Sequence, residues 1–308
     1  MKTLASCLDK AVHRRRKLFS ITNAVRLVNG AGDGLPGLLI DRYNKHFHMQ
    51  VLDDRWQKQT PEILRRLTEA LPVEYLVVKI RRGLRFETAQ IIPGPSRTLV
   101  EEYGLKFEVD LNDGLNCGLF LDMRRNRHMV AKAAAGQRVL NCFSYTCSFG
   151  VHALAGAAVE VVNTDISRRC LERGKNNYSI NGLPVPDEGF VKTDAVLFLQ
   201  RACKKGRRFD IIILDPPSFA RCEGGVFQVK RDLPKTIALA ADVLGPAGRL
   251  LVTTNYSGLD HEDLERMLAQ GLHGRRVAHL QRVGQDEDFV GTNSFKESYM
   301  VGLWVRFL

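Results

Sequence analysis

The segment Asp215-Pro216-Pro217-Ser218-Phe219 is the part of this chain best suited to chemistry. It follows an apolar run of the buried-strand type. The two prolines fix the backbone after that strand, so that carbonyl oxygens and the Asp215 carboxylate face a pocket. The ring of Phe219 can stack on a flat substrate. A rigid loop that merely ends a strand is the simpler alternative, and other residues must decide between the two interpretations.

Two further carboxylates stand where similar strands end. Asp165 closes the second apolar run of the same region, and a carboxylate there can accept both hydroxyl hydrogens of a ribose. Asp194 follows the short strand 190–192, in a position suited to an adenine amino group. The alternatives are a helix N-cap for Asp165, ahead of Ser167, and a solvated turn for Asp194. Together with Asp215, the spacing favours a nucleoside site.

The pattern after Gly136 predicts the elements that position these carboxylates. Apolar runs alternate with helical stretches, which predicts an α/β fold with a Rossmann-like, doubly wound, seven-stranded sheet. The expected strands are Arg138–Cys142, Val159–Asn163, Phe190–Lys192, Ile211–Leu214, Leu250–Thr254, Val277–Val283 and Tyr299–Phe307, and the expected helices are Ser148–Ala157, Ser167–Asn181, Ala195–Arg201 and Leu233–Leu244. Ligands bind such sheets outside the carboxyl ends of the strands. The loops 141–150, 164–167 and 215–219 should therefore meet.

The first of these loops limits the choice of cofactor. It has no G-x-G-x-x-G pattern, so it offers no glycine-lined seat for a pyrophosphate. This weighs against NAD or FAD and favours a nucleoside cofactor without phosphates. No metal site is expected, because the chain has no CxxC pair and no Cys/His cluster with metal-ligand spacing, and Cys142 and Cys147 stand five residues apart.

Composition excludes several classes of protein. The chain has 308 residues, 44% of them hydrophobic, which suits two folded domains and not a disordered chain. It has no apolar run long enough to cross a membrane. The seven cysteines have no paired spacing and the N-terminus lacks a secretory apolar core, so we expect a cytoplasmic protein with reduced thiols.

The net charge of +11 is concentrated in the first third of the chain. Residues 1–100 hold 18 basic and 9 acidic side chains, a net charge of +9, whereas residues 101–308 hold 27 and 25, a net charge of +2. This favours a polyanionic partner on the N-terminal third, and a basic excess without a specific role is the alternative. Near the other end, 286–290 reads as a plain acidic loop in preference to a lid.

The N-terminal third reads as a smaller α+β domain. Its expected strands are 24–28, 37–43, 46–52 and 75–79, and its expected helix is Pro61–Leu71, with Pro61 at the start. Strands and a turn follow, and Asp122 is the predicted N-cap of a helix that continues to Ala135. The predicted organisation is a basic domain over 1–97, a linker over 98–130 and the main domain over 131–308.

Four stretches of the chain carry a resemblance to a known family. They are VNGAGDGLPGLLIDRY at 28–43, GLFLDMRRNR at 118–127, LNCFSYT at 140–146 and DPPSF at 215–219. With these stretches the chain resembles class I S-adenosylmethionine-dependent methyltransferases. In particular, it is similar to the large-subunit ribosomal RNA methyltransferase I family, which makes 5-methylcytosine. The similarity extends from about residue 20 to about residue 260.

The resemblance implies a cofactor, partners and site residues. The cofactor would be S-adenosyl-L-methionine, and the partners would be ribosomal RNA and a second copy of the chain, with no membrane contact. The predicted cofactor-binding residues are Phe120, Asp122, Arg124, Arg127, Asn141, Phe143, Ser144, Tyr145, Thr146, Asp165, Ile166, Asp194 and Asp215. The predicted catalytic group is Asp215, Pro216, Pro217, Phe219, Asn255 and Tyr256. The 1–97 domain would contact the RNA and the 98–130 linker would help to form the cofactor pocket.

The chain departs from the family at two places outside the catalytic group. We expect the chain to lack the family's N-terminal RNA-binding domain, of the pseudouridine-synthase-associated type, and the basic stretch 13–17 to replace some of its phosphate contacts. Cys147 stands where the family has glycine. If that position needs positive φ, the Cβ costs about 1–2 kcal/mol, so we expect a differently shaped loop. A Cys147 nucleophile would sit against the cofactor and is disfavoured.

A third departure concerns the nucleophile. Methylation of carbon 5 of cytosine requires a thiolate that attacks the ring. The family has Ser-Cys-Ser where this chain has Asn255-Tyr256-Ser257, and a tyrosine with a pKa of about 10 cannot replace a thiolate. Cys222 is the one nearby thiol that could reach the site. We therefore prefer a nitrogen target, because its lone pair needs only positioning, an acceptor such as Asp215 and an aromatic ring to stack on.

Other functions stay open at this stage. One is a 5-methylcytosine enzyme with a displaced thiol, and another is a methyltransferase for a small molecule or a protein. A third is a non-catalytic RNA-binding assembly factor that kept the fold. An NAD-dependent reductase is disfavoured by the missing glycine pattern. The fold alone does not decide among these alternatives.

Overall fold

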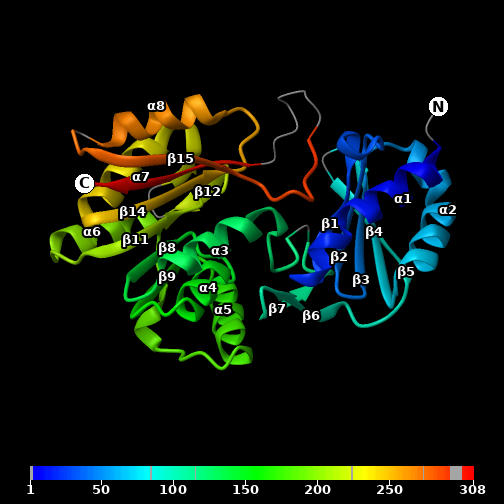
Figure 1. The fold of residues 1–308 in the computed structure, drawn as a ribbon, viewed down its shortest axis with the longest axis horizontal. Helices are drawn as coiled ribbons and strands as arrows, with labels where there is room; N and C mark the ends of the chain where they lie inside the picture. The colour runs from blue at the N-terminus through cyan, green and yellow to red at the C-terminus, as the bar shows by residue number, and fades with distance from the viewer. Residues whose placement is uncertain (1–2, 84, 115, 223–224, 273, 292–299) are drawn as a thin grey trace. The chain divides into compact units, whose positions relative to one another are not determined.

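The structure is a computed structural model that describes residues 3–83, 85–114, 116–222, 225–272, 274–291 and 300–308; of 220–222 it describes only the backbone. It divides into two compact units (Figure 1). Unit 1 contains Met1–Leu121 and Asp286–Glu297, and unit 2 contains Asp122–Gln285 and Ser298–Leu308. The predicted linker 98–130 is thus divided between the two units. No helix among the described residues is long and apolar enough to cross a membrane.

Unit 2 is built on a seven-stranded sheet of order β10-β9-β8-β11-β14-β16-β15. The strands are β8 (Arg138–Cys142), β9 (Glu160–Asp165), β10 (Phe190–Lys192), β11 (Phe209–Leu214), β14 (Leu244–Thr254), β15 (Val277–Gly284) and β16 (Val301–Phe307). The first five strands in the sheet pair in parallel, and β16 pairs antiparallel with β14 and β15. This confirms the predicted doubly wound fold. The strand order reverses between β8 and β11, which are neighbours in the sheet.

Helices cover both faces of this sheet (Figure 1). They are α3 (Arg124–Ala133), α4 (Ser148–Ala155), α5 (Arg168–Ile180), α6 (Ala195–Lys204), α7 (Val229–Val243) and α8 (His261–Leu272). Alternate residues of β11 face opposite cores: Ile212 packs with α6, α7 and α8, whereas Ile211 and Ile213 pack with α3 and α4. Sequence analysis did not predict α8 or the hairpin of β12 (Phe219–Cys222) and β13 (Gly225–Gln228).

The start of α3 differs from the prediction. Met123, whose side chain makes no capping hydrogen bond, occupies the N-cap position, and Asp122 lies in the short 3-10 turn Leu121–Met123 before it. The predicted N-cap role of Asp122 is therefore wrong. Its negative charge instead raises the pKa of Asp215, which places the two carboxylates close enough to interact.

Unit 1 contains a five-stranded sheet of order β1-β2-β3-β4-β5. The strands are β1 (Ala24–Asn29), β2 (Leu38–Tyr43), β3 (His46–Val51), β4 (Tyr75–Arg82) and β5 (Arg85–Ile92). Helices α1 (Leu4–Arg15) and α2 (Arg55–Ala70) contribute to its apolar core, and β6 (Arg97–Glu102) pairs with β7 (Leu105–Asp110) as a separate hairpin. The predicted strands 37–43 and 46–52 form an antiparallel pair, in which Tyr43 pairs with His46 and the turn residue Asn44 has a φ of 60°.

Both helices of unit 1 differ from the sequence analysis. It did not predict α1, and it placed the start of the second helix at Pro61, whereas α2 begins at Arg55 and contains Pro61. The first turn of α2 has a single apolar anchor, Trp56, whose indole nitrogen donates to the carbonyl oxygen of Pro36 at 2.9 Å. One aromatic residue produces no periodicity, so the early start could not be read from the sequence.

The face of the unit 1 sheet opposite its main core is polar and buried. Arg26, Asp41 and His48 are successive cross-strand partners on β1, β2 and β3. Arg26 and Asp41 form an ion pair, and His48 is only 1% exposed. Burial, with the positive charges of Lys79 and Arg26 nearby, lowers the pKa of His48 to about 3. The imidazole is therefore neutral in the folded protein at physiological pH.

The buried neutral His48 should make unit 1 sensitive to acid. The unfolded chain binds a proton at His48 below a pH of about 6.5, whereas the folded protein does so only near pH 3, so stability falls as the pH drops below about 6.5. Between pH 7 and pH 5 this residue should cost wild type about 2 kcal/mol, a loss that His48→Gln removes. Trp56 fluorescence in a Trp304→Phe background reports the urea midpoint of unit 1. The exposed His13, changed to Gln, is the control; equal pH dependence in wild type and His48→Gln contradicts the prediction.

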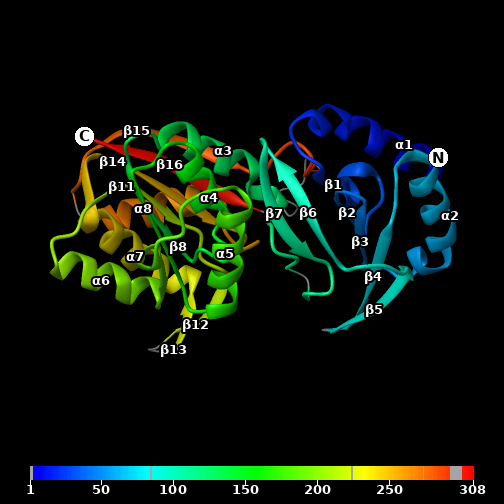
Figure 2. The same ribbon diagram turned by 90° about the horizontal axis from the view of Figure 1, so that it is seen from below.

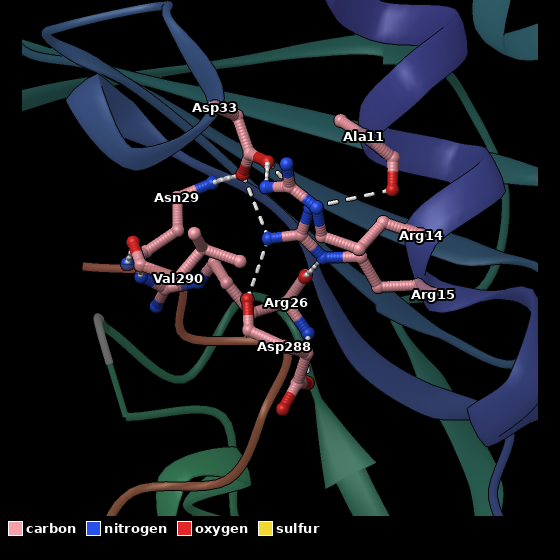
Figure 3. A network of polar contacts seen from close by, with 8 residues as sticks. All are labelled: Ala11, Arg14, Arg15, Arg26, Asn29, Asp33, Asp288 and Val290. Carbon is pink, nitrogen blue, oxygen red and sulfur yellow. Dashed lines mark hydrogen bonds and ion pairs between the residues drawn. The ribbon is translucent and has the colours of Figure 1, made fainter. Parts of the chain in front are cut away.

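Three of the five residues in the basic stretch 13–17 form ion pairs with described carboxylates, and Figure 3 shows two of them, Arg14 and Arg15. Arg15 lies on the buried side of α1, is 0% exposed and forms a two-pronged ion pair with Asp33 at 2.6 and 2.7 Å. Arg14 also bonds Asp33, at 3.0 Å, and Lys17 pairs with Glu287. The expectation that this stretch contacts phosphates is therefore wrong for Arg15, whereas Arg14 and Lys17 are 49% and 65% exposed and for them it stays a prediction.

The segment 286–290 belongs to unit 1, and its residues Asp288 and Phe289 are buried there, whereas Glu287 is exposed (Figure 3). Asp288 is 1% exposed; its carboxylate accepts from the backbone N–H of Arg26 at 2.8 Å and its carbonyl accepts from Arg15 at 2.6 Å. The ring of Phe289 lies 4.7 Å below the Arg26 guanidinium. The prediction of a plain loop is wrong because the buried Arg15 and the Arg26 backbone provide donors for this segment.

Candidate cofactor and substrate site

The loops that follow β8, β9 and β11 come together where the strand order reverses. The backbone N–H of Tyr145 donates to the Asp165 carboxylate at 2.9 Å, which joins the first two loops. The ring of Phe143 lies 5.5 Å from that of Phe227, in the hairpin that follows the third loop. The predicted meeting of these loops at the carboxyl ends of the strands is confirmed, and it creates a site for a nucleoside-sized ligand.

Asp165 is held as a hydrogen-bond acceptor at the end of β9. Besides Tyr145, the N–H of Ser167 donates to it at 2.8 Å, while the Ser167 hydroxyl caps α5 by accepting from Cys170 at 3.2 Å. Burial raises the pKa of Asp165 and these backbone donors lower it again. The N-cap of α5 is thus Ser167, and Asp165 is oriented for a ligand. Ile166 beside it is 46% exposed and offers apolar surface.

Asp194 is buried at the N-cap of α6. It is 8% exposed, and the N–H groups of Val196 and Leu197 both donate to its Oδ1 atom, at 2.8 and 3.2 Å. The solvated-turn alternative is therefore wrong. Among the described residues, none donates to Oδ2, so that oxygen can accept from an amino group of a ligand.

The loop after β8 is strained. Three of its residues that are not glycine have positive φ: 55° at Phe143, 48° at Tyr145 and 59° at Cys147. Each such residue costs about 1–2 kcal/mol, and strain of this kind concentrates at ligand sites. Cys147 thus adopts the left-handed conformation despite its Cβ, contrary to the expectation of a differently shaped loop. Gly174 on α5 makes room for it, since an added Cβ there would lie 2.4 Å from the Cys147 sulfur.

This contact predicts a compensating pair of substitutions. Gly174→Ala should destabilise unit 2 by about 1–3 kcal/mol, because the new methyl group would also lie 2.9 Å from the Cys147 Cβ. Cys147→Gly removes both clashing atoms and leaves only an ordinary 3.5 Å contact with Thr146. The double variant should therefore be more stable than Gly174→Ala alone. Urea unfolding followed by Trp304 fluorescence in a Trp56→Phe background measures this; additive effects would contradict it.

Three other residues predicted to bind the cofactor, Asn141, Ser144 and Thr146, form hydrogen bonds within the protein. The Asn141 side chain donates to Asn163 at 3.0 Å in the buried layer of the sheet, so its amide is committed to the core. Ser144 donates its backbone N–H to Thr164 at 2.9 Å, and the carbonyl of Thr146 accepts from Asn177 at 3.0 Å. These bonds hold the strained loop in place.

Asp215 is the electrostatic centre of the site. The Thr253 hydroxyl donates to its Oδ1 atom at 2.7 Å. Burial of the carboxyl group, together with the charge of Asp122, raises its pKa to about 6, while Thr253 and the charge of Arg127 act in the opposite direction. Arg127 and Arg124 are themselves 1% and 0% exposed on α3. At neutral pH Asp215 is therefore mostly ionised, and its raised pKa makes it a better proton acceptor than an ordinary carboxylate.

The double-proline loop presents an aromatic ring. Phe219 is 61% exposed and meets Tyr256 edge to face, with 6.3 Å between ring centres. The Lys230 ammonium lies 5.3 Å from the centre of the Tyr256 ring, so Phe219 offers the more open face. The Ser218 hydroxyl donates to the Asn255 side chain at 3.2 Å and ties this loop to the end of β14. Pro216 is buried and Pro217 exposed.

Sequence reasoning missed three polar residues of the site, namely Thr253, Ser218 and Lys230. The signal for Thr253 was available, because it lies in the strand beside β11, one residue beyond the partner of Leu214. Phe120 belongs to unit 1, so its predicted role in the cofactor pocket stays a prediction. Among the described residues, no group of three or more His, Cys, Asp or Glu side chains could hold a metal ion.

A doubly wound sheet with carboxylates where its parallel strands end is typical of nucleoside-binding α/β enzymes. The family described as S-adenosylmethionine-dependent methyltransferase matches residues 85–287, about two thirds of the chain. The chain therefore belongs to the S-adenosylmethionine-dependent methyltransferases, and the predicted activity and cofactor are confirmed at that level.

Individual relatives are more specific. Ribosomal RNA large subunit methyltransferase I of Aeromonas salmonicida is 35% identical over 294 residues, which cover 91% of this chain and 74% of that protein. The protein of the same name from Tolumonas auensis is 35% identical and covers 92% and 75%. A solved methyltransferase complexed with SAH is 26% identical, covers 98% of this chain and 80% of its own, and has a TM-score of 0.90. A methyltransferase from Streptococcus mutans has a TM-score of 0.87 at the same identity and coverage.

Proposed function

We propose that this enzyme transfers a methyl group to a nitrogen atom of a base in ribosomal RNA. The similarity to ribosomal RNA large subunit methyltransferases I, over nine tenths of this chain, supports the class of substrate. The observation that carries the choice of a nitrogen is the state of the thiols around the site.

The two buried thiols that begin and end the loop after β8 are not suited to attack a cytosine ring. Burial raises the pKa of Cys142 to about 12 and raises that of Cys147 further still. Both thiols are therefore protonated at neutral pH, and a protonated thiol is a poor nucleophile. The position where the similar family has its cysteine holds Tyr256 in this chain. The side chain of Cys222 lies outside the described residues.

The site residues fit the parts of S-adenosylmethionine. Asp165 has carboxylate oxygens suited to ribose hydroxyls, Asp194 keeps Oδ2 for the adenine amino group, and Ile166 offers apolar surface to a base. The buried guanidiniums of Arg124 and Arg127 suit the cofactor's carboxylate. When bound, the cofactor supplies an electrophilic methyl group on a sulfonium.

The chain's own residues then position the acceptor. Phe219 stacks on the target base, and the adjacent prolines hold the backbone that carries it. A nitrogen with a lone pair needs no covalent activation, and where it is an exocyclic amine, Asp215 accepts the proton that the amine loses. Asn255, whose side-chain oxygen accepts from Ser218, bonds the edge of the base in this proposal.

Transfer of labelled methyl groups to total RNA from a strain lacking the gene tests this function. We expect label in large-subunit ribosomal RNA, and mass spectrometry of the nucleosides should identify an N-methylated base. A labelled 5-methylcytidine that disappears with Cys222→Ser would overturn the nitrogen target. Label in protein or small molecules with none in RNA would overturn the class of substrate. Asp165→Ala, which should lose cofactor binding, is the control for enzyme-dependent labelling.

Two further predictions accompany this function. A ribosomal RNA substrate is consistent with a cytoplasmic location. A homodimer, implied by the family resemblance, stays a prediction that the oligomeric state in solution can test.

A further inference from the structure

Most basic side chains of unit 1 are neutralised within the unit. Ion pairs with described carboxylates are formed by Arg14, Arg15, Lys17, Arg26, Lys45, Arg55, Arg65, Arg66, Arg82 and Arg97. By contrast, no described residue forms an ion pair with the exposed side chains of Lys10, Arg16, Lys58, Arg81 or Arg85. Of these five cations, Arg81 and Arg85 lie near each other, at the shared end of β4 and β5.

Arg81 and Arg85 lie on a two-stranded ribbon that reaches past the rest of the sheet. The pairing of β3 with β4 ends at Val51 and Ile80, whereas the pairing of β4 with β5 continues to Arg82 and Arg85. Figure 2 shows β4 and β5 running side by side to their shared end. Because β5 is the edge strand and these residues are exposed, the ribbon can be approached from more than one side.

Two positive charges on this ribbon lie opposite each other and destabilise it. Arg82 and Arg85 are direct cross-strand partners, and like charges in that position repel. Asp54 at 2.9 Å and Glu87 at 3.2 Å neutralise Arg82, but no described carboxylate neutralises Arg85. Arg81, opposite Phe86, donates to the carbonyl of Gly83 at 3.1 Å, which restrains its guanidinium near the turn. An anionic partner would relieve the repulsion.

We propose that the β4–β5 ribbon, through Arg81 and Arg85, binds the phosphate backbone of the RNA substrate; this rests on the proposed function. Guanidinium groups bind phosphates with paired hydrogen bonds. Phosphate contacts of this kind fix position without reading sequence. The ribbon thus offers two exposed guanidinium groups without ion pairs to described residues, whereas Arg14, Arg15 and Lys17 of the stretch 13–17 are paired with carboxylates.

The full-length protein with Arg81→Gln and Arg85→Gln tests the proposal. Its binding to large-subunit ribosomal RNA should be about tenfold weaker, and the slope of log K against log salt should fall by about 1.5, since each lost phosphate contact removes 0.7–0.9. Methylation should show a raised KM and an unchanged kcat. Arg81→Lys with Arg85→Lys keeps both charges and should retain the wild-type slope.

The matched control removes two other unpaired cations of the same unit, as Lys10→Gln with Arg16→Gln. If this control loses as much affinity and slope as the ribbon variant, the effect is one of net charge and the proposal is overturned. It is equally overturned if the ribbon variant binds like wild type. Both results leave the proposed function standing whenever wild type methylates the RNA, so the two failures are distinguishable.

Discussion

Asp215→Asn should lower kcat of methyl transfer by about 10²- to 10⁴-fold while leaving cofactor binding in place. The change removes the carboxylate proposed to accept the departing amine proton, and general-base contributions have this size. Because the pKa of Asp215 is raised to about 6, wild-type kcat should rise with pH through about 6 and then level off. The asparagine variant should lose this rising limb of the pH profile of kcat.

Substitution of two charged neighbours should move the rising limb of kcat in opposite directions if Asp215 is the titrating group. Arg127→Gln removes a positive charge that lowers the pKa of Asp215, so the limb should move to higher pH. Asp122→Asn removes a negative charge that raises it, so the limb should move to lower pH. Asp210→Asn, at the opposite end of β11 and paired with Arg138, is the control that should leave the limb in place. A limb at the same pH in all variants would show that another group titrates.

The second large effect is expected at the buried ion pair of unit 1. Asp33→Ala leaves the Arg15 guanidinium, which is 0% exposed, without its carboxylate. Removing one partner of a buried pair costs about 3–5 kcal/mol, because the charge that remains is desolvated and uncompensated. The urea midpoint reported by Trp56 in a Trp304→Phe background should fall accordingly.

The same stretch of chain offers controls for this stability effect. Lys17→Gln breaks the exposed pair with Glu287 and should cost no more than about 1 kcal/mol. Arg15→Met should cost less than Asp33→Ala, since Asp33 keeps Arg14 and the backbone N–H of Asn29 as partners. The double variant should lose less than the sum of the two single changes. Equal losses in Asp33→Ala and Lys17→Gln would contradict the buried pair.

The parts of the fold that could be predicted from sequence are those with a strong local pattern. Strands such as Arg138–Cys142 are continuous apolar runs, and the site follows from a general rule about where parallel strands end. The loop residues at 143–147 were predicted by family resemblance, but their strain and its relief by Gly174 depend on a helix packed against them.

What could not be predicted depends on contacts between distant residues. A row of basic residues reads as solvated until it is known that Arg15 faces inward on α1 and meets Asp33. The acidic residue Asp288 reads as exposed for the same reason, because its donors on Arg15 and Arg26 lie more than 260 positions away in sequence. The role of Asp122 beside Asp215 is likewise a tertiary effect.

The burial of Asp288 and Phe289 in unit 1 bears on how the molecule is made. The N-terminal part of the chain leaves the ribosome first, yet the donors on Arg15 and Arg26 acquire their last acceptor only after residue 288 has been translated. Maturation of the first unit must therefore wait until the segment around Asp288 has emerged. A nascent chain that stops before this point would expose an unfinished, charged interior, a state on which chaperones and proteases act.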